Sequence, residues 1–482
     1  MLVLAVLATN ITGFPSATDD EGTYLAQAWA VQQGNGLAHY TYWYDHPPLG
    51  WIQLAALSWL PALLGWHEPT VAVGRLAMLP VVAASLLLVY LISRRLGLAR
   101  WAAALALLTY GLSPLAVTMN RQIYLDSFAV AWILAAVALA LSPRRHLWHY
   151  TAAGIATAIA VLSKETMLVA VPAVLVAMWQ NGSRSSTRPW TFGGYASGLV
   201  LVGVFYPLYA LLRGELIPGA GHVSLLGAWQ FQLASRSGSG SVFQAGSGSW
   251  SLVHSWLYYD PVILVEGLAS TVIALAMRRL RAAALAAALL AIIALRPGGY
   301  LPAMFVVQIL PFFAIVIAGV IHHGVIGLSP RRHWWRATVL GVIAVIAVAG
   351  IVPRWYAGDR RALVADDNAS YSAAAHYLRT TVPHRDETTV VVDDVLWLDC
   401  VGAGYRTDNV IWFYKLDLDP AVAARLHHGW RDVDYIVSTP ALRQDAASLP
   451  TVTTLLTHST VIASYGSDTG RIDIRHIDKE TA

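Results

Sequence analysis

The residues best suited to chemistry in this sequence are acids and cations near the ends of long apolar segments. The first group is TDDEGTY, residues 18–24, where three consecutive carboxylates follow an apolar opening. Thr18 and Glu21 fit a helix capping box, and acids in the first turn of a helix suit its dipole. This local explanation does not require Asp20, and it leaves open a chemical role for the stretch.

The second group is YDHPPLG, residues 44–50. Its two prolines fix φ and remove two amide donors, so the backbone is stiff and extended. Such a turn can hold Asp45 and His46 in fixed directions, with His46 donating a hydrogen bond to an anionic group. The alternative is that the prolines only provide a rigid lead into the next helix.

A third group, NRQIYLDSF, opens another apolar segment at residues 120–128. Arg121 and Asp126 could pair with each other where the helix begins. They could also have separate roles, because the planar Arg fork binds phosphate oxygens bidentately. Asp126 would then orient a base or a cation.

Two more cations stand at segment ends. Lys164 lies beside Glu165 in LSKETM, residues 162–167, either as a site residue or as a plain ion pair or snorkelling side chain. Arg296 precedes two glycines in LRPGGYLPAMF, residues 295–305, and glycine allows close backbone approach. Arg296 is therefore a second candidate for binding phosphate.

The elements that must position these residues are membrane-embedded. The chain has 482 residues, of which 56% are hydrophobic and 12% charged, and its mean hydropathy is +0.53. Soluble domains carry about 25% charged residues. The net charge of +4 comes from scattered clusters, so no nucleic-acid surface is expected. One cysteine, Cys400, excludes an intramolecular disulfide and argues against a cysteine-ligated metal.

Apolar patterning predicts an α-helical polytopic membrane protein. Of the 20 Lys and Arg residues before position 355, 13 lie in alternate loops, which predicts that these loops are cytoplasmic. The membrane-domain acids then lie at or near the outer face, which favours an outward-facing site; longer outer loops are the alternative. The eleven predicted spans are 1–14, 71–92, 101–118, 127–141, 150–163, 166–180, 192–212, 256–277, 282–295, 300–320 and 337–353.

Two long outer loops, residues 15–70 and 213–255, are predicted to carry polar groups to that face. The first contains two expected interfacial helices, EGTYLAQAWAVQ and LGWIQLAALSWLPALL. Residues 234–250 of the second are rich in Gly and Ser, which predicts either a mobile lid or a plain connector.

The C-terminal part has a different composition, since 18 of the 28 acids follow residue 354. We expect a membrane domain over 1–354 and a water-soluble α/β domain over 355–482. The expected elements are a helix over 370–382 and strands over 388–398 and 433–440. An odd number of spans with an inside N-terminus places this domain outside the cytoplasm. No G-x-G-x-x-G follows a strand, so we expect no nucleotide site.

Together TDDEGTY, HPPLG, RQIYLDSF and the apolar run YLPAMFVVQILPFFAIVIAG resemble the GT-C glycosyltransferases. The likeness is strongest to the dolichyl-phosphate-mannose protein mannosyltransferases and the lipid A aminoarabinose transferases, and it covers roughly residues 10–320. Two positions depart from these families. The mannosyltransferases carry Lys where Trp51 stands, and the aminoarabinose transferases carry Lys in place of His46.

The resemblance implies an inverting transfer of a monosaccharide from a polyprenyl-phosphate donor to an acceptor hydroxyl, outside the plasma membrane. The Asp of an Asp-Glu pair, here Asp20 and Glu21, would deprotonate the acceptor. The expected partners are the donor, membrane lipid and an acceptor glycan, lipid or protein, but no nucleic acid. A divalent cation stays open as a cofactor, with Asp126 or Asp20 as its ligand. The residues expected to bind donor phosphate or substrate are His46, Arg121, Asp126, Lys164, Arg296, Tyr24 and Asp45.

The main alternative from another class is a transporter or flippase of polyprenyl-linked or anionic substrates. It would need charged residues at the membrane midplane and often has inverted repeats with broken helices. The sequence shows neither feature. A scaffold with a degenerate site is a further alternative, against which the joint presence of Asp20, Arg121 and Lys164 argues.

Overall fold

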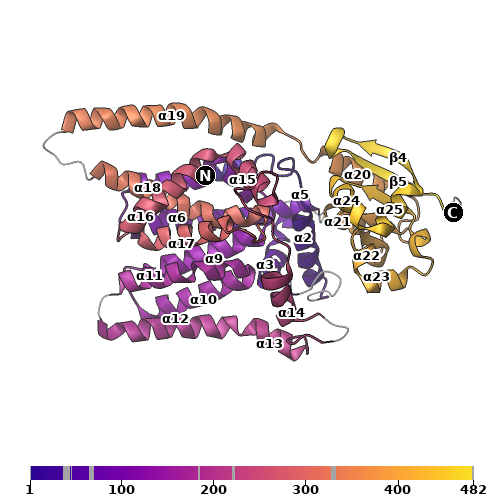
Figure 1. Cartoon of the computed structure of the whole chain (residues 1–482), viewed down its shortest axis with the longest axis horizontal. Coiled ribbons are helices and arrows are strands. Elements are labelled where there is room, and N and C mark those ends of the chain that lie inside the picture. The colour runs from indigo at the N-terminus through magenta and orange to yellow at the C-terminus, as the bar shows by residue number, and fades with distance from the viewer. Residues whose placement is uncertain are drawn as a thin grey trace. The chain divides into compact units, whose positions relative to one another are not determined.

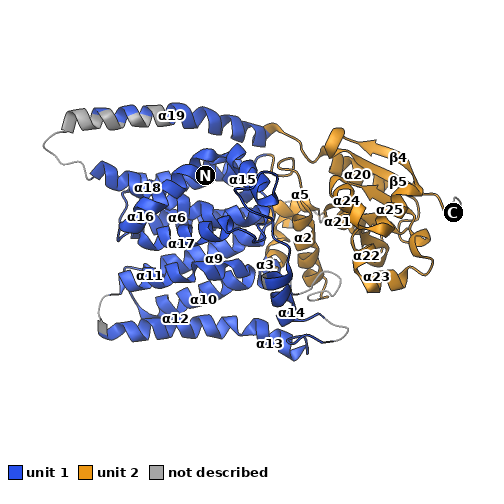
Figure 2. Ribbon diagram, in the orientation of Figure 1, with its two compact units in different colours: residues 1–9, 42–53, 78–363 blue, residues 10–41, 54–77, 364–482 orange. Residues whose placement is uncertain are grey.

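The structure is a computed structural model that describes residues 2–35, 44, 46–63, 70–182, 185–219, 223–326 and 333–479. The chain divides into two compact units (Figure 2). Unit 1 comprises residues 1–9, 42–53 and 78–363, and unit 2 comprises residues 10–41, 54–77 and 364–482. This division places two parts of the first long outer loop in the unit that holds the C-terminal domain. The predicted domain boundary after residue 354 remains a prediction.

Unit 1 is built of helices (Figure 1). They are α1 (Leu2–Ala8), α3 (Leu49–Leu57, which begins here), α6 (Leu79–Arg95), α7 (Arg100–Leu112), α8 (Pro114–Asn120), α9 (Leu125–Ala140), α10 (Leu147–Ser163), α11 (Val171–Asn181), α12 (Arg188–Gly203), α13 (Phe205–Leu212), α14 (Leu225–Gln230), α15 (Gly248–Tyr259), α16 (Pro261–Ala276), α17 (Arg281–Leu295), α18 (Val306–Ile326) and α19 (His333–Val364).

Several of these helices can cross a membrane. Within the described ranges, three stretches are long and apolar enough: Val71–Arg95, Arg188–Leu212 and Ala303–Ile326. The number rises to five if two bent pairs each form one span, α7 with α8 at 63° and α15 with α16 at 104°. The predicted polytopic helical class is confirmed, and the count of eleven spans remains a prediction.

The predicted apolar segments lie largely on helices, but the segments 101–118 and 256–277 are each broken by a bend, and the segment at the start of the chain is too long. Helix α1 ends at Ala8, so the helix predicted over 1–14 is too long. Asn10 has a φ of 57°, in the left-handed region that Asn adopts more readily than most residues. This polar residue ends the helical path before the apolar sequence itself ends.

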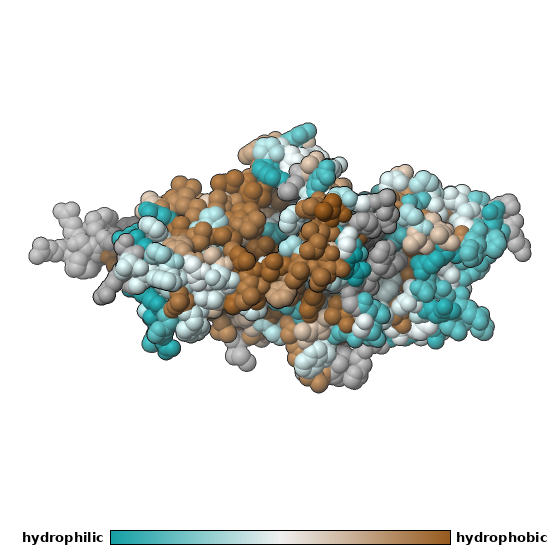
Figure 3. Space-filling model, turned by 90° about the horizontal axis from the view of Figure 1, so that it is seen from below, coloured by the Kyte–Doolittle hydropathy of each residue, from teal (hydrophilic) through white to brown (hydrophobic). Residues whose placement is uncertain are grey.

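The face of the molecule seen in Figure 3 carries a broad apolar surface. Helices α12 and α13 expose large aliphatic and aromatic side chains, among them Leu201 at 62%, Phe205 at 60% and Leu212 at 79%. Water-soluble proteins rarely expose contiguous apolar patches of more than a few hundred Å². These two helices are therefore suited to contact with lipid.

Unit 2 combines helices with a five-stranded sheet of order β2-β1-β3-β5-β4. Strand β1 is parallel to β2 and β3, whereas β5 is antiparallel to β3 and β4. Val391, Ile411 and Ile436 of the parallel strands are buried in the core of this domain. The elements are α2 (Asp19–Gln32), α4 (Leu60–Leu63), α5 (Val71–Gly74), α20 (Ala369–Thr380), β1 (Val390–Val392), α21 (Asp394–Gly402), β2 (Val410–Trp412), α22 (Lys415–Leu418), α23 (Pro420–Arg425), β3 (Tyr435–Ser438), α24 (Pro440–Asp445), α25 (Pro450–Thr457), β4 (Ser459–Tyr465) and β5 (Ile472–Ile477).

The α/β class predicted for the C-terminal part is confirmed, with one strand too long. Helix α20 matches the helix predicted over 370–382, and β3 lies within 433–440. The strand predicted over 388–398 is limited to Val390–Val392. Asp393 ends it by accepting a hydrogen bond from the Leu396 amide at 3.1 Å, which caps α21. The apolar residues that follow Asp393 are therefore helical.

Candidate active site

In unit 1 the HPPLG and LSKETM motifs lie against each other. A Cβ atom on Gly50 would lie 3.0 Å from the Ser163 carbonyl oxygen and 2.8 Å from Leu125 Cδ2. Glycine is therefore needed for this close approach. Pro48 also leads into α3, whose Ile52 amide donates to the Pro48 oxygen at 3.2 Å. The same turn therefore leads rigidly into α3 and also positions His46.

His46 joins the side chains of Lys164 and Glu165. Lys164 Nζ lies 2.9 Å from His46 Nε2, and His46 Nδ1 lies 3.2 Å from Glu165 Oε2. Because an ammonium group can only donate, Nε2 accepts and the Nδ1–H donates to the carboxylate. The geometry therefore fits a neutral imidazole. In this structure His46 donates to the Glu165 carboxylate, and binding of donor phosphate by His46 remains a prediction.

Lys164 retains hydrogen-bonding capacity. It is only 3% exposed, and its ammonium group carries three N–H bonds. Among the residues that the structure describes, only His46 Nε2 is hydrogen-bonded to it. The Lys164 ammonium group can therefore bind further acceptors, such as phosphate oxygens.

Asp126 stabilises the same region from α9. Gln308 of α18 donates from Nε2 to Asp126 Oδ1 at 2.5 Å and to Thr166 Oγ1 at 2.6 Å. Asp126 also interacts electrostatically with Lys164. Sequence reasoning missed Gln308, although a single amide within the long apolar run of α18 was a signal for a buried polar contact.

Arg121 has a different environment from the one predicted. Its guanidinium group donates to the backbone oxygens of Val6, Thr9 and Ala362, at 2.6, 2.9 and 2.7 Å. These bonds connect the end of α1 to α19, while Asp126 is bound by Gln308 instead. The geometry favours a structural role for Arg121 over binding of phosphate.

Arg296 directly follows α17 and is exposed. Its backbone amide donates to the Ile293 oxygen at 3.4 Å, whereas its side chain forms no hydrogen bond or ion pair within the described part of the chain. A Cβ atom on Gly299 would lie only 2.4 Å from Arg296 Nε. The glycine is therefore what leaves space for the guanidinium group. The Ser239 amide donates to the Gly299 oxygen at 3.0 Å, which brings the Gly- and Ser-rich segment to the same turn. The mobility of residues 234–250 remains a prediction.

In unit 2 the TDDEGTY stretch forms the start of α2, and its Glu21 is fully buried. Arg75 donates bidentately to this carboxylate, from Nε to Oε1 at 2.8 Å and from Nη2 to Oε2 at 2.7 Å. The Thr18 amide donates to Glu21 Oε2 at 3.2 Å, which is the side-chain half of the predicted capping box. Glu21 is thus committed to the fold. Sequence reasoning missed Arg75, although a lone Arg inside an apolar segment signals a buried partner.

Asp20, in contrast, is exposed. The helix that carries it is held closely, because a Cβ atom on Gly22 would lie 2.2 Å from the Asp394 carbonyl oxygen of α21. Tyr24, on the same helix, is buried. Asp20 therefore projects from a rigid element. Asp45 of the second motif lies outside the described residues.

Asp19 belongs to a group of carboxyls within unit 2. Burial, followed by the nearby carboxylates of Asp393 and Asp20, raises the pKa of Asp19 to about 8. Burial also raises the pKa of Asp393, which accepts a hydrogen bond from the Tyr371 hydroxyl at 2.8 Å. Asp19 is therefore largely protonated at neutral pH, unlike a conventional surface carboxylate. The three consecutive acids thus have three different environments.

The described residues contain no group of three or more His, Cys, Asp or Glu side chains placed to hold a metal ion. Asp126 and Asp20 are accordingly metal ligands only in the prediction. No step proposed below is routed through a cation.

Comparison with known proteins places this geometry in context. Residues 45–207 match a family model described as dolichyl-phosphate-mannose-protein mannosyltransferase. ArnT from Cupriavidus metallidurans bound to undecaprenyl phosphate has a similar structure, with a TM-score of 0.63 and 15% identity over 98% of this chain and 96% of that one. The Archaeoglobus fulgidus oligosaccharyltransferase in the apo form gives a TM-score of 0.53 and 13% identity, over 99% and 74% of the two chains.

The mycobacterial arabinofuranosyltransferase AftD is a further structure of this kind, with a TM-score of 0.50 and 14% identity over 98% of this chain and 41% of that one. No curated protein matches the sequence. At these identities the likeness establishes the fold. The resemblance to the GT-C glycosyltransferases expected from the motifs is confirmed.

Proposed function

We propose that this chain, which has the fold of the GT-C glycosyltransferases, is an inverting glycosyltransferase. It moves a monosaccharide from a polyprenyl-phosphate donor to an acceptor hydroxyl on the outer face of the plasma membrane. An odd number of spans with an inside N-terminus, as expected from the sequence, would put the C-terminal domain on the same face. Support for the donor class comes from the likeness, over 98% of the chain, to a protein bound to undecaprenyl phosphate.

The observation that carries the proposal is the contrast between neighbouring acids at α2. Glu21 is buried on Arg75, which fixes the helix, while Asp20 is exposed. In the reaction Asp20 takes the proton of the acceptor hydroxyl. The hydroxyl oxygen attacks the anomeric carbon from the side opposite the phosphate, and polyprenyl phosphate leaves with the bonding electron pair.

Negative charge grows on the leaving phosphate during this step. This charge is stabilised by Lys164 and by the exposed Arg296. Lys164 has N–H bonds without an acceptor among the described residues. Asp126 supports the turn that carries Lys164, because Gln308 bonds both to Asp126 and to Thr166.

The test uses purified protein in lipid nanodiscs with hexosyl and pentosyl polyprenyl phosphates. Envelope glycans from a strain that lacks the gene serve as acceptors. We expect release of polyprenyl phosphate above the level of empty nanodiscs, and a product whose anomeric configuration is inverted by NMR. A product with retained configuration, or no release from any donor, contradicts the proposal.

A transporter is the second candidate, because the bent pairs α7–α8 and α15–α16 are broken helices of the kind that transporters use. The two breaks meet where Ser113 Oγ donates to Asp260 Oδ2 at 2.6 Å. Asp260 Oδ1 accepts from the Val262 and Ile263 amides as well, so the acid is engaged by the protein itself. Movement of a lipid-linked sugar across proteoliposomes without transfer would favour this candidate.

A further inference from the structure

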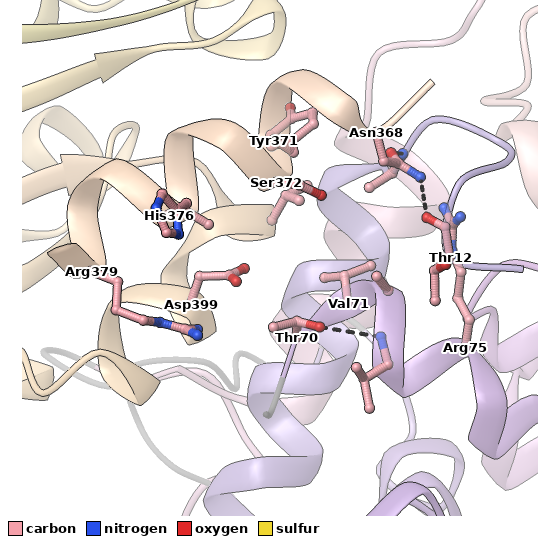
Figure 4. A pocket seen from close by; sticks show the side chains of 15 residues that line it. Thr12, Thr70, Val71, Arg75, Asn368, Tyr371, Ser372, His376, Arg379 and Asp399 are labelled. Carbon is pink, nitrogen blue, oxygen red and sulfur yellow. Dashed lines mark hydrogen bonds between the residues drawn. The ribbon is translucent and has the colours of Figure 1, made fainter. Parts of the chain in front are cut away.

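A pocket of about 700 Å³ lies within unit 2 (Figure 4). One helix, α20, contributes Tyr371, Ser372 and His376 to its wall, and α21 contributes Asp399. Thr70 and the start of α5 form another side. The volume is in the range of pockets that bind small molecules.

The walls of this pocket are fixed by hydrogen bonds. The Asn368 side-chain amide donates to the backbone oxygens of Thr12 and Pro15, at 2.8 and 2.9 Å. Its oxygen accepts from the Ala17 amide at 2.8 Å. These bonds hold the segment that leads into α2 against the start of α20. The pocket is therefore preformed, which lowers the ordering cost of binding.

The chemistry of the wall suits a neutral ligand rich in hydroxyl groups. Arg379 and Asp399 bring opposite charges, and the charge of Arg75 is balanced by Glu21. The apolar part of the wall consists of small Ala and Val side chains, without a deep slot for an acyl chain. Neither an anion nor a lipid tail matches this lining.

The secondary structure of the wall favours a sugar over an extended peptide as the ligand. All lining residues come from helices and connecting segments, and none from a strand. An extended peptide is commonly bound by addition to the edge of a sheet, which this wall does not offer. The planar polar groups of Arg379 and Asp399 and the ring of Tyr371 instead suit a carbohydrate ring.

We propose that this pocket binds a sugar residue of the acceptor, so that the acceptor is a glycan. The inference rests on the proposed function and specifies its acceptor class. Ala17, at the pocket wall, is three residues before Asp20, and both belong to unit 2. A glycan held here is bound in the unit that carries the proposed base.

The test is native mass spectrometry of the full chain in nanodiscs. The probe is the mixture of oligosaccharides released from the envelope of a strain lacking the gene. Ser372→Trp fills the pocket from an exposed position on α20, and Thr380→Trp places the same side chain at an exposed position outside the pocket. His376→Ala removes a polar wall group without adding volume.

We expect Ser372→Trp to reduce the bound oligosaccharide at least tenfold, His376→Ala to reduce it about threefold, and Thr380→Trp to leave it unchanged. Equal binding by all variants, no binding by the wild-type protein, or binding of envelope peptides in place of oligosaccharides overturns the inference. Hydrolysis of the polyprenyl-phosphate donor by Ser372→Trp should stay near wild type. Absence of donor turnover in the wild-type protein would instead count against the proposed function.

Discussion

The acidic start of α2 in unit 2 and the group of His46, Lys164 and Glu165 in unit 1 differ in which charged side chain is buried. At α2, Glu21 is buried and bound bidentately by Arg75, while the adjacent Asp20 is exposed. In unit 1 the cation Lys164 is buried, and the side chain of the neighbouring acid, Glu165, is 38% exposed. Residue type therefore does not separate structural from reactive charges. Burial and exposure separate Glu21 from Asp20, and Lys164 differs from Glu21 in keeping N–H bonds without a partner among the described residues.

The largest effect is expected where a saturated pair is broken. Arg75→Ala leaves the Glu21 carboxylate buried without its partner, and breaking a buried ion pair in this way costs about 3–5 kcal/mol. Thermal unfolding in nanodiscs should show a strongly lowered Tm or no folded protein. The double variant Glu21→Gln/Arg75→Met should be milder, because no charge remains buried. A Tm of Arg75→Ala equal to that of the wild type would show that the pair is not structural.

Removing the unsaturated cation should instead change catalysis. Lys164→Met deletes a charge-assisted contact to the donor phosphate, which is worth about 1.5–3 kcal/mol, or about 10–100-fold in the KM for donor. The unfolding temperature should change little in comparison with Arg75→Ala. Initial-rate kinetics with a polyprenyl-phosphate sugar measure this, and Glu165→Gln provides a control that keeps the ammonium group. An unchanged KM would remove Lys164 from the site.

Two arginines test the same distinction between a catalytic and a structural cation, with smaller expected changes in KM and Tm. Arg296→Ala should raise the KM for donor by about 5–20-fold and leave the Tm unchanged, because Arg296 is exposed and unsatisfied among the described residues. Arg121→Ala should lower the Tm, since its three bonds to backbone carbonyls are lost. The reverse assignment, with Arg121 controlling KM and Arg296 controlling Tm, would contradict the roles given to them.

The smallest effect is a pH dependence at Asp19. Its pKa in the folded protein is about 8, above the ordinary 3.8, so the folded state binds the proton more tightly than the unfolded state. Stability should fall as pH rises from about 4 to 8. Asp19→Asn should flatten this fall and raise the Tm at pH 8.5 by about 2–4 °C, with little change at pH 4. An unaltered pH profile of Tm would show that Asp19 is not held protonated.

The sequence predicted the helices better than it predicted the partners of their polar side chains. The apolar run of α18 and the capping pattern of Thr18 and Glu21 are local features, so they were readable. The bond from Gln308 to Asp126 joins residues 182 positions apart, and no local pattern encodes it. The strand that ends before Asp393 was predicted too long. The apolar residues before and after Asp393 show no periodicity that would tell a strand from a helix. The contacts of Arg121 could not be read for a related reason, since its partners are backbone oxygens that carry no side-chain signature.

The central claim is that Asp20 is the base and that its neighbours are not. The direct test measures kcat for sugar transfer by Asp20→Asn and Asp19→Asn, two changes of the same chemistry at adjacent positions. We predict that Asp20→Asn lowers kcat by about 10²–10⁴-fold with an unchanged Tm, and that Asp19→Asn stays within about threefold of wild type. Transfer by Asp20→Asn at a near-normal rate, in protein that is folded and inserted, would contradict the account.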